Sequence, residues 1–589
     1  MNPPSLPGSA DSTAVADMTS PQRQLRRELR AQLAVVTGGI APDDFIAAWW
    51  DWYLNILKRP QKPSALAVAA LQGALDTWQF ALQAAAGAPV APSPPDDPRF
   101  AGEPWSVWPF NMYTRGYKNW ASWWQQALTH VPGMADKNAK LMSFMGGQLL
   151  DAASPSNYLW TNPELLETTR AESGQNLVRG FKHWADDLQR MLKRGSPAES
   201  EHFKVGVDVA VTPGKVVFRN RLIELIQYAP QTPTVYAEPI LITPAWIMKY
   251  YILDLSPANS LVAYLVAQGH TVFMISWKNP NEADRDLGMD DYLELGMRAA
   301  LAAVSAIVPE RRIHAVGYCI GGTLLAIGAA ALARDNDQRI ASVTTFAAQT
   351  DFSEPGELSL FISPSQLEML EAVMHKQGVL DSDKMAASFM MLRSRDLLWT
   401  PAINKYLRGK LDTSSDLMAW NADGTRMPWR MHTEYLHRLF LHNELARGQF
   451  PVAGQPINLA AITLPVFVVG TETDHVAPWR SVYKTRALTR SSDYTFLLTS
   501  GGHNAGIVSG PTHARRRHRL LTWNDSATMM SPEQWLEKAE MRAGSWWPSW
   551  LQWLREHSAQ DQVSPPALGM AERGYGVLGD APGDYVREK

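Results

Sequence analysis

The first part of the chain changes from an unpatterned stretch to a helical one. Residues 1–20 mix Pro, Ser, Ala and Asp without periodicity, and we expect them to be disordered. After residue 40, large apolar side chains recur at the spacing of one helix face, namely Phe45, Trp49, Trp52 and Ile56. Asp43 or Asp44 is placed to cap this helix. Because aromatic-rich helical patterns continue beyond it, we predict a helical N-terminal domain over residues 21–200.

After residue 200 the pattern changes to strands that alternate with helices. The first two strands are predicted at 203–211 and 215–226, joined by a turn at Thr212-Pro213-Gly214. Further strands are predicted at 239–243, 270–276, 312–318 and 340–347, and helices at 259–268, 290–308 and 321–333. Continuous apolar strands separated by helices indicate a parallel sheet that is covered on both faces. The fold class is therefore α/β, and residues 201–351 form the first part of its core.

A long insertion interrupts this alternation. Residues 352–460 are mostly helical in pattern, and strands return only at 465–469 and 494–498. A last helix is predicted to begin at Ser531, with a proline at its first position and Gln534 at its third. Residues 461–589 therefore hold the second part of the core with a C-terminal helix and tail. The insertion is predicted to be a lid over the carboxyl edge of the sheet.

The most specific local motif surrounds the only cysteine and reads Gly317-Tyr318-Cys319-Ile320-Gly321-Gly322. It follows an apolar strand and opens a helix, which is the setting of a nucleophile elbow. A side chain on such a sharp turn needs neighbours without a Cβ, and Gly317 and Gly321 stand two residues before and after Cys319. The N-terminus of the following helix favours a thiolate. We predict that Cys319 is a nucleophile rather than a small buried apolar residue.

A thiol nucleophile needs a base, and in this fold an acid and then a histidine follow it along the chain. His503 is the best-placed histidine, in a glycine-flanked loop after the last predicted core strand. Asp474 is the preferred acid because it follows the penultimate strand. Glu472 and Asp351 are alternatives at strand ends. His475 is an alternative base that more simply braces its loop.

An oxyanion formed at this site needs preorganised donors. One donor is the backbone N–H of Ile320, and the second is expected from the loop after strand 239–243, at Trp246 or Ile247. The sequence shows no phosphate-binding glycine loop and no paired-cysteine metal motif. His432, His437 and His442 are interpreted as lid surface, so we expect no metal and no bound cofactor.

Composition narrows the class of protein. The chain has 55 basic and 58 acidic residues, so its net charge of -3 gives no footprint for nucleic acid. A single cysteine excludes an intrachain disulfide, and residues 1–20 lack the features of a secretory signal. Apolar runs fall short of the roughly 18 residues that a membrane span needs. We expect a cytoplasmic protein. The 23 tryptophans, concentrated toward both ends, serve either as interface or as core residues.

Several motifs together resemble those of polyhydroxyalkanoate synthases, from about residue 95 to the C-terminus. Besides the elbow, the matching segments are Ser154-Pro155-Ser156-Asn157, Thr161-Asn162-Pro163-Glu164, Lys249-Tyr250-Tyr251-Ile252-Leu253-Asp254-Leu255, Asp416-Leu417-Met418-Ala419-Trp420-Asn421, Asp474-His475-Val476-Ala477-Pro478-Trp479, Gly502-His503-Asn504-Ala505-Gly506 and Gly544-Ser545-Trp546-Trp547-Pro548. Met248 departs from the family pattern, where a polar residue is usual, so the preferred acyl length is left open.

The resemblance implies an α/β-hydrolase fold with a helical lid, and an enzyme that polymerises (R)-3-hydroxyacyl-CoA. Cys319 would then carry the growing polyester, while His503 activates the thiol and Asp474 assists. Family members of the single-subunit class act as homodimers through the lid-bearing domain, and they coat polyester granules together with granule-associated proteins. Two alternatives remain: a thioesterase or lactone hydrolase on the same fold, and a non-catalytic granule-binding protein.

Overall fold

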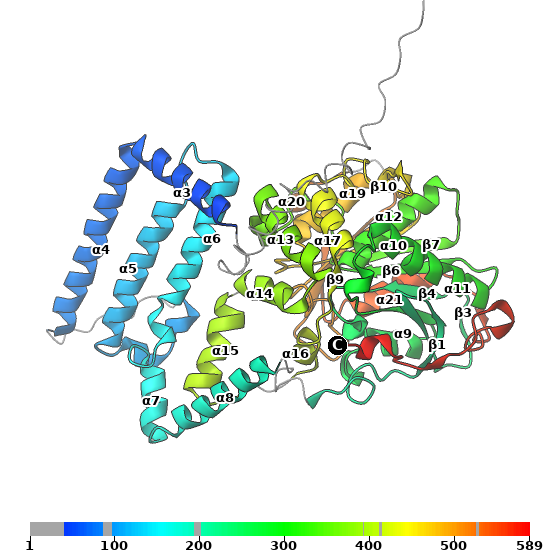
Figure 1. Cartoon of the computed structure of the whole chain (residues 1–589), viewed down its shortest axis with the longest axis horizontal. Helices are drawn as coiled ribbons and strands as arrows, with labels where there is room; N and C mark the ends of the chain where they lie inside the picture. The colour runs from blue at the N-terminus through cyan, green and yellow to red at the C-terminus, as the bar shows by residue number, and fades with distance from the viewer. Residues whose placement is uncertain (1–40, 86–96, 194–201, 393, 412–414, 526–528) are drawn as a thin grey trace, which may run out of the picture.

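The chain comprises a helical N-terminal part beside a larger α/β part, with further helices between them (Figure 1). The computed structural model describes residues 41–85, 97–193, 202–392, 394–411, 415–525 and 529–589. The disorder predicted for residues 1–20 therefore falls outside the described residues. Within the described parts of the chain, no helix is both long and apolar enough to span a bilayer.

The N-terminal part is built from helices that enclose a small apolar core of their own. The helices are α3 (Pro42–Leu57), α4 (Gln61–Ala85), α5 (Phe110–Leu128), α6 (Asp136–Ala152), α7 (Pro163–Ala171) and α8 (Gln175–Leu192), with the short turns η2 (Pro98–Phe100), η3 (Glu103–Ser106) and η4 (Pro155–Asn157). The core buries Ala48, Leu128, Val131, Met134, Leu141 and Met142. Trp52 and Ile56 of α3 pack against it.

The start of α3 differs from the sequence-based expectation. Its N-cap is Ala41, which makes no side-chain cap, and Pro42 occupies the first turn. Asp43 and Asp44 therefore lie inside the first turn. Their negative charges interact favourably with the positive end of the helix dipole, but neither residue caps the helix. The Asp44 carboxylate accepts a hydrogen bond from Ser363 of the lid. Phe45 and Trp49 remain 38% exposed, so the predicted apolar stripe is partly buried only at its C-terminal end.

One large mixed sheet forms the centre of the α/β part. Its strands are β1 (Gly214–Arg219), β2 (Ile223–Tyr228), β4 (Ile240–Thr243), β5 (Val272–Trp277), β6 (Ile313–Tyr318), β7 (Ile340–Phe346), β12 (Val466–Thr471), β13 (Tyr494–Thr499), β14 (Arg517–Trp523), β15 (Glu540–Ala543) and β17 (Gly579–Asp580). They lie in the order β15-β14-β13-β12-β7-β6-β4-β5-β2-β1-β17. The strands from β13 to β5 in this order are parallel, and the pairs outside them are antiparallel. The predicted α/β architecture is confirmed.

The first hairpin is shifted from its predicted position. Residues 203–211 form no strand of the sheet, and β1 instead pairs with β2 around a turn at residues 220–222. Asn220 explains the shift, because its side-chain oxygen accepts hydrogen bonds from the backbone N–H groups of Leu222 and Ile223 at 2.8 and 2.9 Å. Such an Asx turn reverses the chain where no Gly or Pro announces it.

Helices cover the sheet and bury its apolar strands. They are α9 (Leu261–Ala267), α10 (Met289–Asp291), η9 (Tyr292–Arg298), α11 (Ala299–Ile307), α12 (Ile320–Arg334), α18 (Trp479–Tyr483), α19 (Thr485–Leu488), α20 (Pro532–Lys538) and α21 (Trp547–Glu556). Ser531 and Gln534 form the predicted capping box of α20. That helix is not the last one, however, since α21 follows and packs its tryptophans on Phe346 of β7.

The lid is an insertion between β7 and β12. It contains α13 (Pro364–Gln377), α14 (Ser382–Leu392), η11 (Arg395–Trp399), α15 (Thr400–Ala402), η12 (Ile403–Leu407), α16 (Asp416–Asn421), α17 (Trp429–Tyr435), η13 (Leu436–Leu441), and the short strands β8 (Val379–Leu380), β9 (Met427–Pro428), β10 (Pro451–Val452) and β11 (Gln455–Pro456). Helix α8 lies directly against η12, where Asn176 donates to the Leu407 carbonyl at 2.8 Å. At Gly180 a Cβ would overlap the carbonyl oxygen of Tyr406. The N-terminal part is therefore packed closely against the lid.

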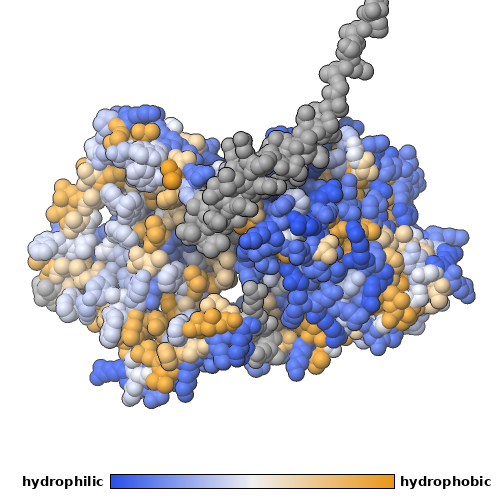
Figure 2. Space-filling view, in the orientation of Figure 1, coloured by the Kyte–Doolittle hydropathy of each residue, from blue (hydrophilic) through white to orange (hydrophobic). Residues whose placement is uncertain are grey.

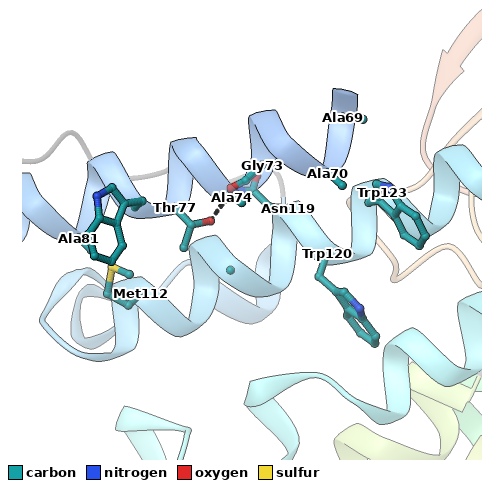
Figure 3. Close-up of a pocket in the computed structure, with 12 residues that line it drawn as sticks. Ala69, Ala70, Gly73, Ala74, Thr77, Ala81, Met112, Asn119, Trp120 and Trp123 are labelled. Atoms are coloured by element: carbon teal, nitrogen blue, oxygen red, sulfur yellow. Dashed lines mark hydrogen bonds between the residues drawn. The ribbon is translucent and has the colours of Figure 1, made fainter. Parts of the chain in front are cut away.

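Many large apolar side chains of the N-terminal helices face solvent. Figure 2 shows them over this part of the molecule, whereas the α/β part beside it is mostly hydrophilic on the same face. Trp78 of α4 is 65% exposed and Phe181 of α8 is also 65% exposed. A groove of about 620 Å³ runs between α4 and α5, lined by small residues of α4 and by Met112, Trp120 and Trp123 of α5 (Figure 3).

After α21 the chain crosses to the edge of the sheet opposite β15. β16 (Gln562–Val563) pairs with β3 (Val235–Tyr236), and β17 adds to the edge strand β1. The turn η16 (Tyr585–Arg587) then ends beside the lid, close to α16 (Figure 1).

Candidate active site

Cys319 occupies a sharp corner between β6 and α12. It is the N-cap of α12, with φ 54° and ψ -128°, a conformation that residues with a Cβ rarely adopt. A Cβ on Gly317 would lie 2.8 Å from the Gly321 carbonyl oxygen, and one on Gly321 would overlap the Thr243 carbonyl oxygen. Both glycines are therefore required for the corner to form.

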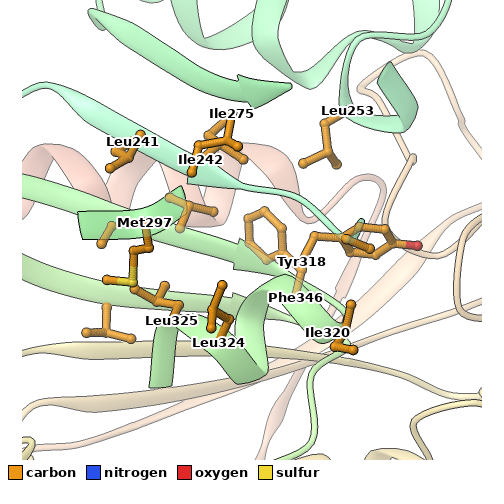
Figure 4. Packing of buried hydrophobic residues seen from close by; sticks show 14 of the residues in the cluster. Leu241, Ile242, Leu253, Ile275, Met297, Tyr318, Ile320, Leu324, Leu325 and Phe346 are labelled. Carbon is orange, nitrogen blue, oxygen red and sulfur yellow. The ribbon is translucent and has the colours of Figure 1, made fainter. Parts of the chain in front are cut away.

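The corner rests on a fully packed apolar core. Tyr318 and Ile320, which flank the cysteine, are 1% and 3% exposed and point into this core (Figure 4). Cys319 itself is only partly buried. Its sulfur is therefore accessible, while the buried residues on either side fix its backbone. The sulfur also lies at the N-terminus of a 15-residue helix, whose dipole favours negative charge there.

The two other predicted catalytic residues lie at the same edge of the sheet. Asp474 follows β12 and His503 follows β13, and both strands run parallel to β6. The Asp474 carboxylate accepts a hydrogen bond from Nδ1 of His503 at 2.8 Å. Cys319 lies near enough to the His503 ring for its side chain to contribute to raising the pKa of that ring. The structure thus brings Cys319, His503 and Asp474 to one edge of the sheet, with a hydrogen bond between the last two.

The Asp474 carboxylate is completely buried and fixed by its own loop. It accepts hydrogen bonds from the Thr471 hydroxyl at 2.9 Å and from the backbone N–H groups of Val476 and Ala477 at 2.9 and 2.8 Å. Burial alone would raise the pKa of Asp474, but the charge and hydrogen bond of His503 outweigh it and lower the pKa below its ordinary value. The group is therefore ionised at neutral pH.

The same contacts control the protonation of His503, which is 13% exposed. Burial favours the neutral imidazole, but Asp474 and then Cys319 favour the imidazolium by charge and hydrogen bonding. Together they raise the pKa of His503 well above its ordinary value. The ring is accordingly able to hold a proton taken from the thiol.

The alternative acids and base have other contacts. Glu472 is bonded to Arg517 at 3.0 Å. Asp351 accepts hydrogen bonds from the Ser353 backbone at 2.7 Å and from Asn443 of the lid at 3.0 Å. His475 lies in the Asp474 loop, and a Cβ at Gly356 would lie 2.7 Å from its carbonyl oxygen. The His503 contact therefore favours Asp474 over its rivals.

The predicted oxyanion donors lie on either side of the elbow. Ile320 is the first residue of α12, where a backbone N–H has no partner within the helix. Thr243, at the end of β4, pairs with Gly317, so the following residues 244–247 run beside the elbow. Carbonyls of Trp246 and Ile247 both accept hydrogen bonds from Thr425 of the lid. Because a trans peptide points its N–H opposite to its C=O, the N–H of Ile247 is turned away from Thr425.

Sequence reasoning missed a second link between the elbow and the histidine loop. The Tyr318 hydroxyl donates a hydrogen bond to Asn504 at 2.6 Å, and the Tyr318 ring lies 5.6 Å from that of His503. Both residues belong to the quoted motifs, as direct neighbours of Cys319 and His503, which was the available signal. Burial and then the charge of Cys319 raise the pKa of Tyr435 in the lid, so this phenol lies within electrostatic range of the thiol. No spacing in the sequence indicates that proximity.

The predicted surface position of the lid histidines is wrong for His432, which is 3% exposed within α17. His437 is hydrogen-bonded to Glu371 at 2.6 Å, and its ring stacks on that of His442 with 6.4 Å between the ring centroids. Among the described residues, no group of three or more His, Cys, Asp or Glu side chains is arranged to hold a metal ion.

Replacing Asp474 with asparagine is expected to shift the pH dependence of the site. Without the carboxylate the imidazolium loses its main support, so the pKa of His503 falls back toward its ordinary value. The limb of the pH–rate profile that belongs to His503 should move to lower pH, and kcat should fall about 10²- to 10⁴-fold. Glu472→Gln is the matched control, because Glu472 contacts Arg517 instead. An unmoved limb in Asp474→Asn would exclude Asp474 as the partner that sets this pKa.

Comparison with known proteins gives concordant matches. Residues 96–265 match the family described as poly-beta-hydroxybutyrate polymerase (PhaC) N-terminus, and residues 238–509 match the alpha/beta hydrolase fold. A poly(3-hydroxyalkanoate) polymerase of Methylorubrum extorquens is 39% identical over 90% of this chain and 88% of its own length. The poly(3-hydroxyalkanoate) polymerase subunit PhaC of Rhizobium meliloti (strain 1021) is 35% identical over 97% and 94%. That of Cupriavidus necator is 36% identical over 87% and 86%.

Proposed function

We propose a function from one premise: this chain belongs to the poly(3-hydroxyalkanoate) polymerase family and has the α/β-hydrolase fold. The enzyme is an acyltransferase. Its proposed reaction polymerises (R)-3-hydroxyacyl-CoA into polyester and releases CoA, through an acyl group carried on Cys319. The observation that carries this assignment is the partly buried thiol at a strained strand–helix corner, close to a histidine that is hydrogen-bonded to Asp474.

The first step is a thioester exchange. Cys319 gives its proton to His503, and the sulfur attacks the thioester carbonyl carbon of the substrate. A bond from that carbon to Cys319 forms and the bond to the CoA sulfur breaks, while the proton on His503 goes to the leaving thiolate. The developing oxyanion is held by the N–H of Ile320 and by that of Ile247. Thiolate exchange for thiolate keeps the step near thermoneutral.

Elongation uses the same base. The hydroxyl oxygen of one 3-hydroxyacyl unit attacks the thioester carbonyl of another, and His503 accepts the hydroxyl proton. An ester bond forms, the carbon–sulfur bond breaks, and the released sulfur takes the proton. Water competes with the hydroxyl at this stage, so polymerisation requires a site that excludes water. The lid over residues 352–460 supports that requirement.

Incubation with 3-hydroxybutyryl-CoA tests the proposal. CoA release and polymer formation are followed together, and both are expected from the unmodified enzyme. CoA release with only free 3-hydroxybutyrate as product would instead assign a hydrolase. Absence of CoA release from a folded protein would leave a non-catalytic protein of the same fold.

The proposed location is the surface of cytoplasmic polyester granules. Exposed apolar side chains on α3, α4 and α8, such as Trp50, Trp78 and Phe181, support it because a polyester surface is apolar and ester-rich. Sedimentation with artificial polyester particles measures this, and protein that stays wholly in the supernatant would contradict it. A homodimer formed through the lid-bearing domain is proposed from the family resemblance. Analytical ultracentrifugation should give twice the mass of the chain, and the mass of a single chain would contradict the proposal.

A further inference from the structure

The residues just before the end of the sequence reach the loop that carries the proposed second oxyanion donor. We call residues 244–249 the β4 loop, residues 423–426 the lid turn, and residues 584–589 the tail. The β4 loop contains the start of the motif Lys249-Tyr250-Tyr251, which the reaction described above does not use. The three segments come from distant parts of the sequence and meet beside α16 (Figure 1).

The lid turn fixes the direction of the peptide groups in the β4 loop. Thr425 donates its hydroxyl to the Trp246 carbonyl, and its backbone N–H donates to the Ile247 carbonyl at 3.3 Å. Met248 forms an isolated antiparallel bridge with Gly424. On the other side of the loop, the Trp277 indole donates to the Pro244 carbonyl at 2.9 Å. The orientation of the Ile247 N–H therefore depends on how the lid turn is held.

Lys249 connects the β4 loop to the tail. Its side chain is 2% exposed, and its ammonium donates hydrogen bonds to the carbonyl oxygens of Glu588 at 2.7 Å and Tyr585 at 3.3 Å. Burial lowers the pKa of Lys249 to about 8, against the opposing pull of the Asp423 and Glu588 carboxylates. A buried ammonium costs free energy that an apolar side chain of similar length does not. A buried ammonium at this position therefore indicates a role for Lys249 beyond packing.

The tail also holds the lid turn. The lid turn is further bonded to Asn279, and the tail is bonded to the core. Arg426 donates to the Lys589 carbonyl at 3.1 Å and its backbone N–H donates to Asn279 at 2.9 Å. The Asn279 backbone N–H in turn donates to the Glu588 carboxylate at 3.1 Å. The tail itself is anchored to the core, because the fully buried Glu224 carboxylate accepts from the backbone N–H groups of residues 584 and 585 at 2.9 Å.

We propose that Lys249 is a positioning residue, which joins the tail to the β4 loop and so holds the Ile247 N–H in place for the oxyanion. This proposal rests on the proposed function. The ammonium fixes the C-terminal end of the β4 loop, and the tail holds the lid turn that fixes its peptide groups. A lid turn displaced from Trp246 and Ile247 would release both carbonyls, so the donor would lose its preorganised direction.

Two substitutions of Lys249 test this role. Lys249→Met keeps the stem but removes all donors, and it is expected to lower kcat for CoA release about 10- to 100-fold with KM within about twofold of wild type. An equal fall in kcat and kcat/KM is the result of losing a contact made only in the transition state. Lys249→Arg keeps a buried cation with donors and should recover kcat to within about fivefold. Each kcat is calculated per Cys319 that can be alkylated in the native protein, so that inaccessible or misfolded protein is left out of the enzyme concentration.

Lys215→Met is the matched control. Lys215 also pairs with the returning C-terminal segment, through Asp580 of β17, but it contacts neither the β4 loop nor the lid turn. The same chemical change at that position should leave kcat unchanged. If Lys249→Met fails to fold, Thr425→Val provides the second variant, because it removes the hydroxyl that binds the Trp246 carbonyl. It is expected to lower kcat at least fivefold, again without a change in KM.

The outcomes separate the two proposals. If wild-type enzyme releases no CoA, the proposed function fails before Lys249 is tested. If wild type is active and Lys249→Met has the kcat of Lys215→Met, the positioning role is wrong. A loss that appears wholly in KM, or one that Lys249→Arg does not recover, likewise overturns it.

Discussion

Replacement of Cys319 by alanine is expected to abolish both CoA release and polymer formation, by at least about 10⁴-fold in kcat. The reason is that every proposed bond exchange passes through this sulfur, and no second cysteine exists in the chain to replace it. His503 and Asp474 would retain their 2.8 Å contact but would have no nucleophile to activate. A spectrophotometric thiol assay for free CoA, run together with polymer extraction, measures both losses.

Cys319→Gly separates catalysis from folding. At φ 54° and ψ -128° a Cβ is strained, and glycine relieves about 1–3 kcal/mol of that strain. The glycine variant should therefore be at least as stable as the alanine variant in thermal unfolding, yet equally inactive. Because the chain has one cysteine, labelling by iodoacetamide at a stoichiometry of one should inactivate wild type completely. Polymer made by either variant or by fully alkylated enzyme would disprove covalent catalysis at Cys319.

Replacement of His503 by glutamine should lower kcat about 10³-fold. Glutamine approximates the size of the ring but cannot accept the thiol proton and return it to the leaving group. The loss should be smaller than that of Cys319→Ala, because the nucleophilic sulfur itself remains in place. Single-turnover release of CoA measures the acylation step separately from elongation.

His513→Gln is the control for His503. His513 is also partly buried and hydrogen-bonded, to Asn259 at 3.0 Å, but it lies outside the site. Its replacement should leave the acylation rate within about twofold of wild type. If His503→Gln acylates at the wild-type rate, the raised pKa of the ring has no catalytic purpose and the base must be sought elsewhere.

The elbow and its partners were accessible from sequence because their chemistry is local. Gly317 and Gly321 are demanded by the turn itself, and Asp474 and His503 follow strands whose carboxyl ends meet at one edge. The α/β sheet was predictable for the same reason, since continuous apolar strands alternate with helices. The sequence already favoured Asp474 over Glu472, and the structure adds a reason, because it pairs Glu472 with Arg517.

The errors arose where long-range contacts or an unrecognised turn decide the conformation. Asn220 makes the first hairpin turn through its side chain, although Pro213 and Gly214 form the more conspicuous turn sequence. Asp44 contacts lid residue Ser363 rather than capping its own helix. No periodicity predicts the bonds of the tail to Lys249, because they join positions more than 330 residues apart.

The contact between α8 and η12 ties the N-terminal helices to the lid. Gly180 and Tyr406 approach too closely for any side chain to intervene, and Asn176 and Tyr406 add hydrogen bonds at 2.8 and 2.9 Å. A movement of η12 relative to the α/β core must therefore either break these contacts or carry α8 along with it. The lid and the N-terminal helices are thus mechanically coupled, and a surface that binds the exposed apolar side chains of α8 would also restrain the lid.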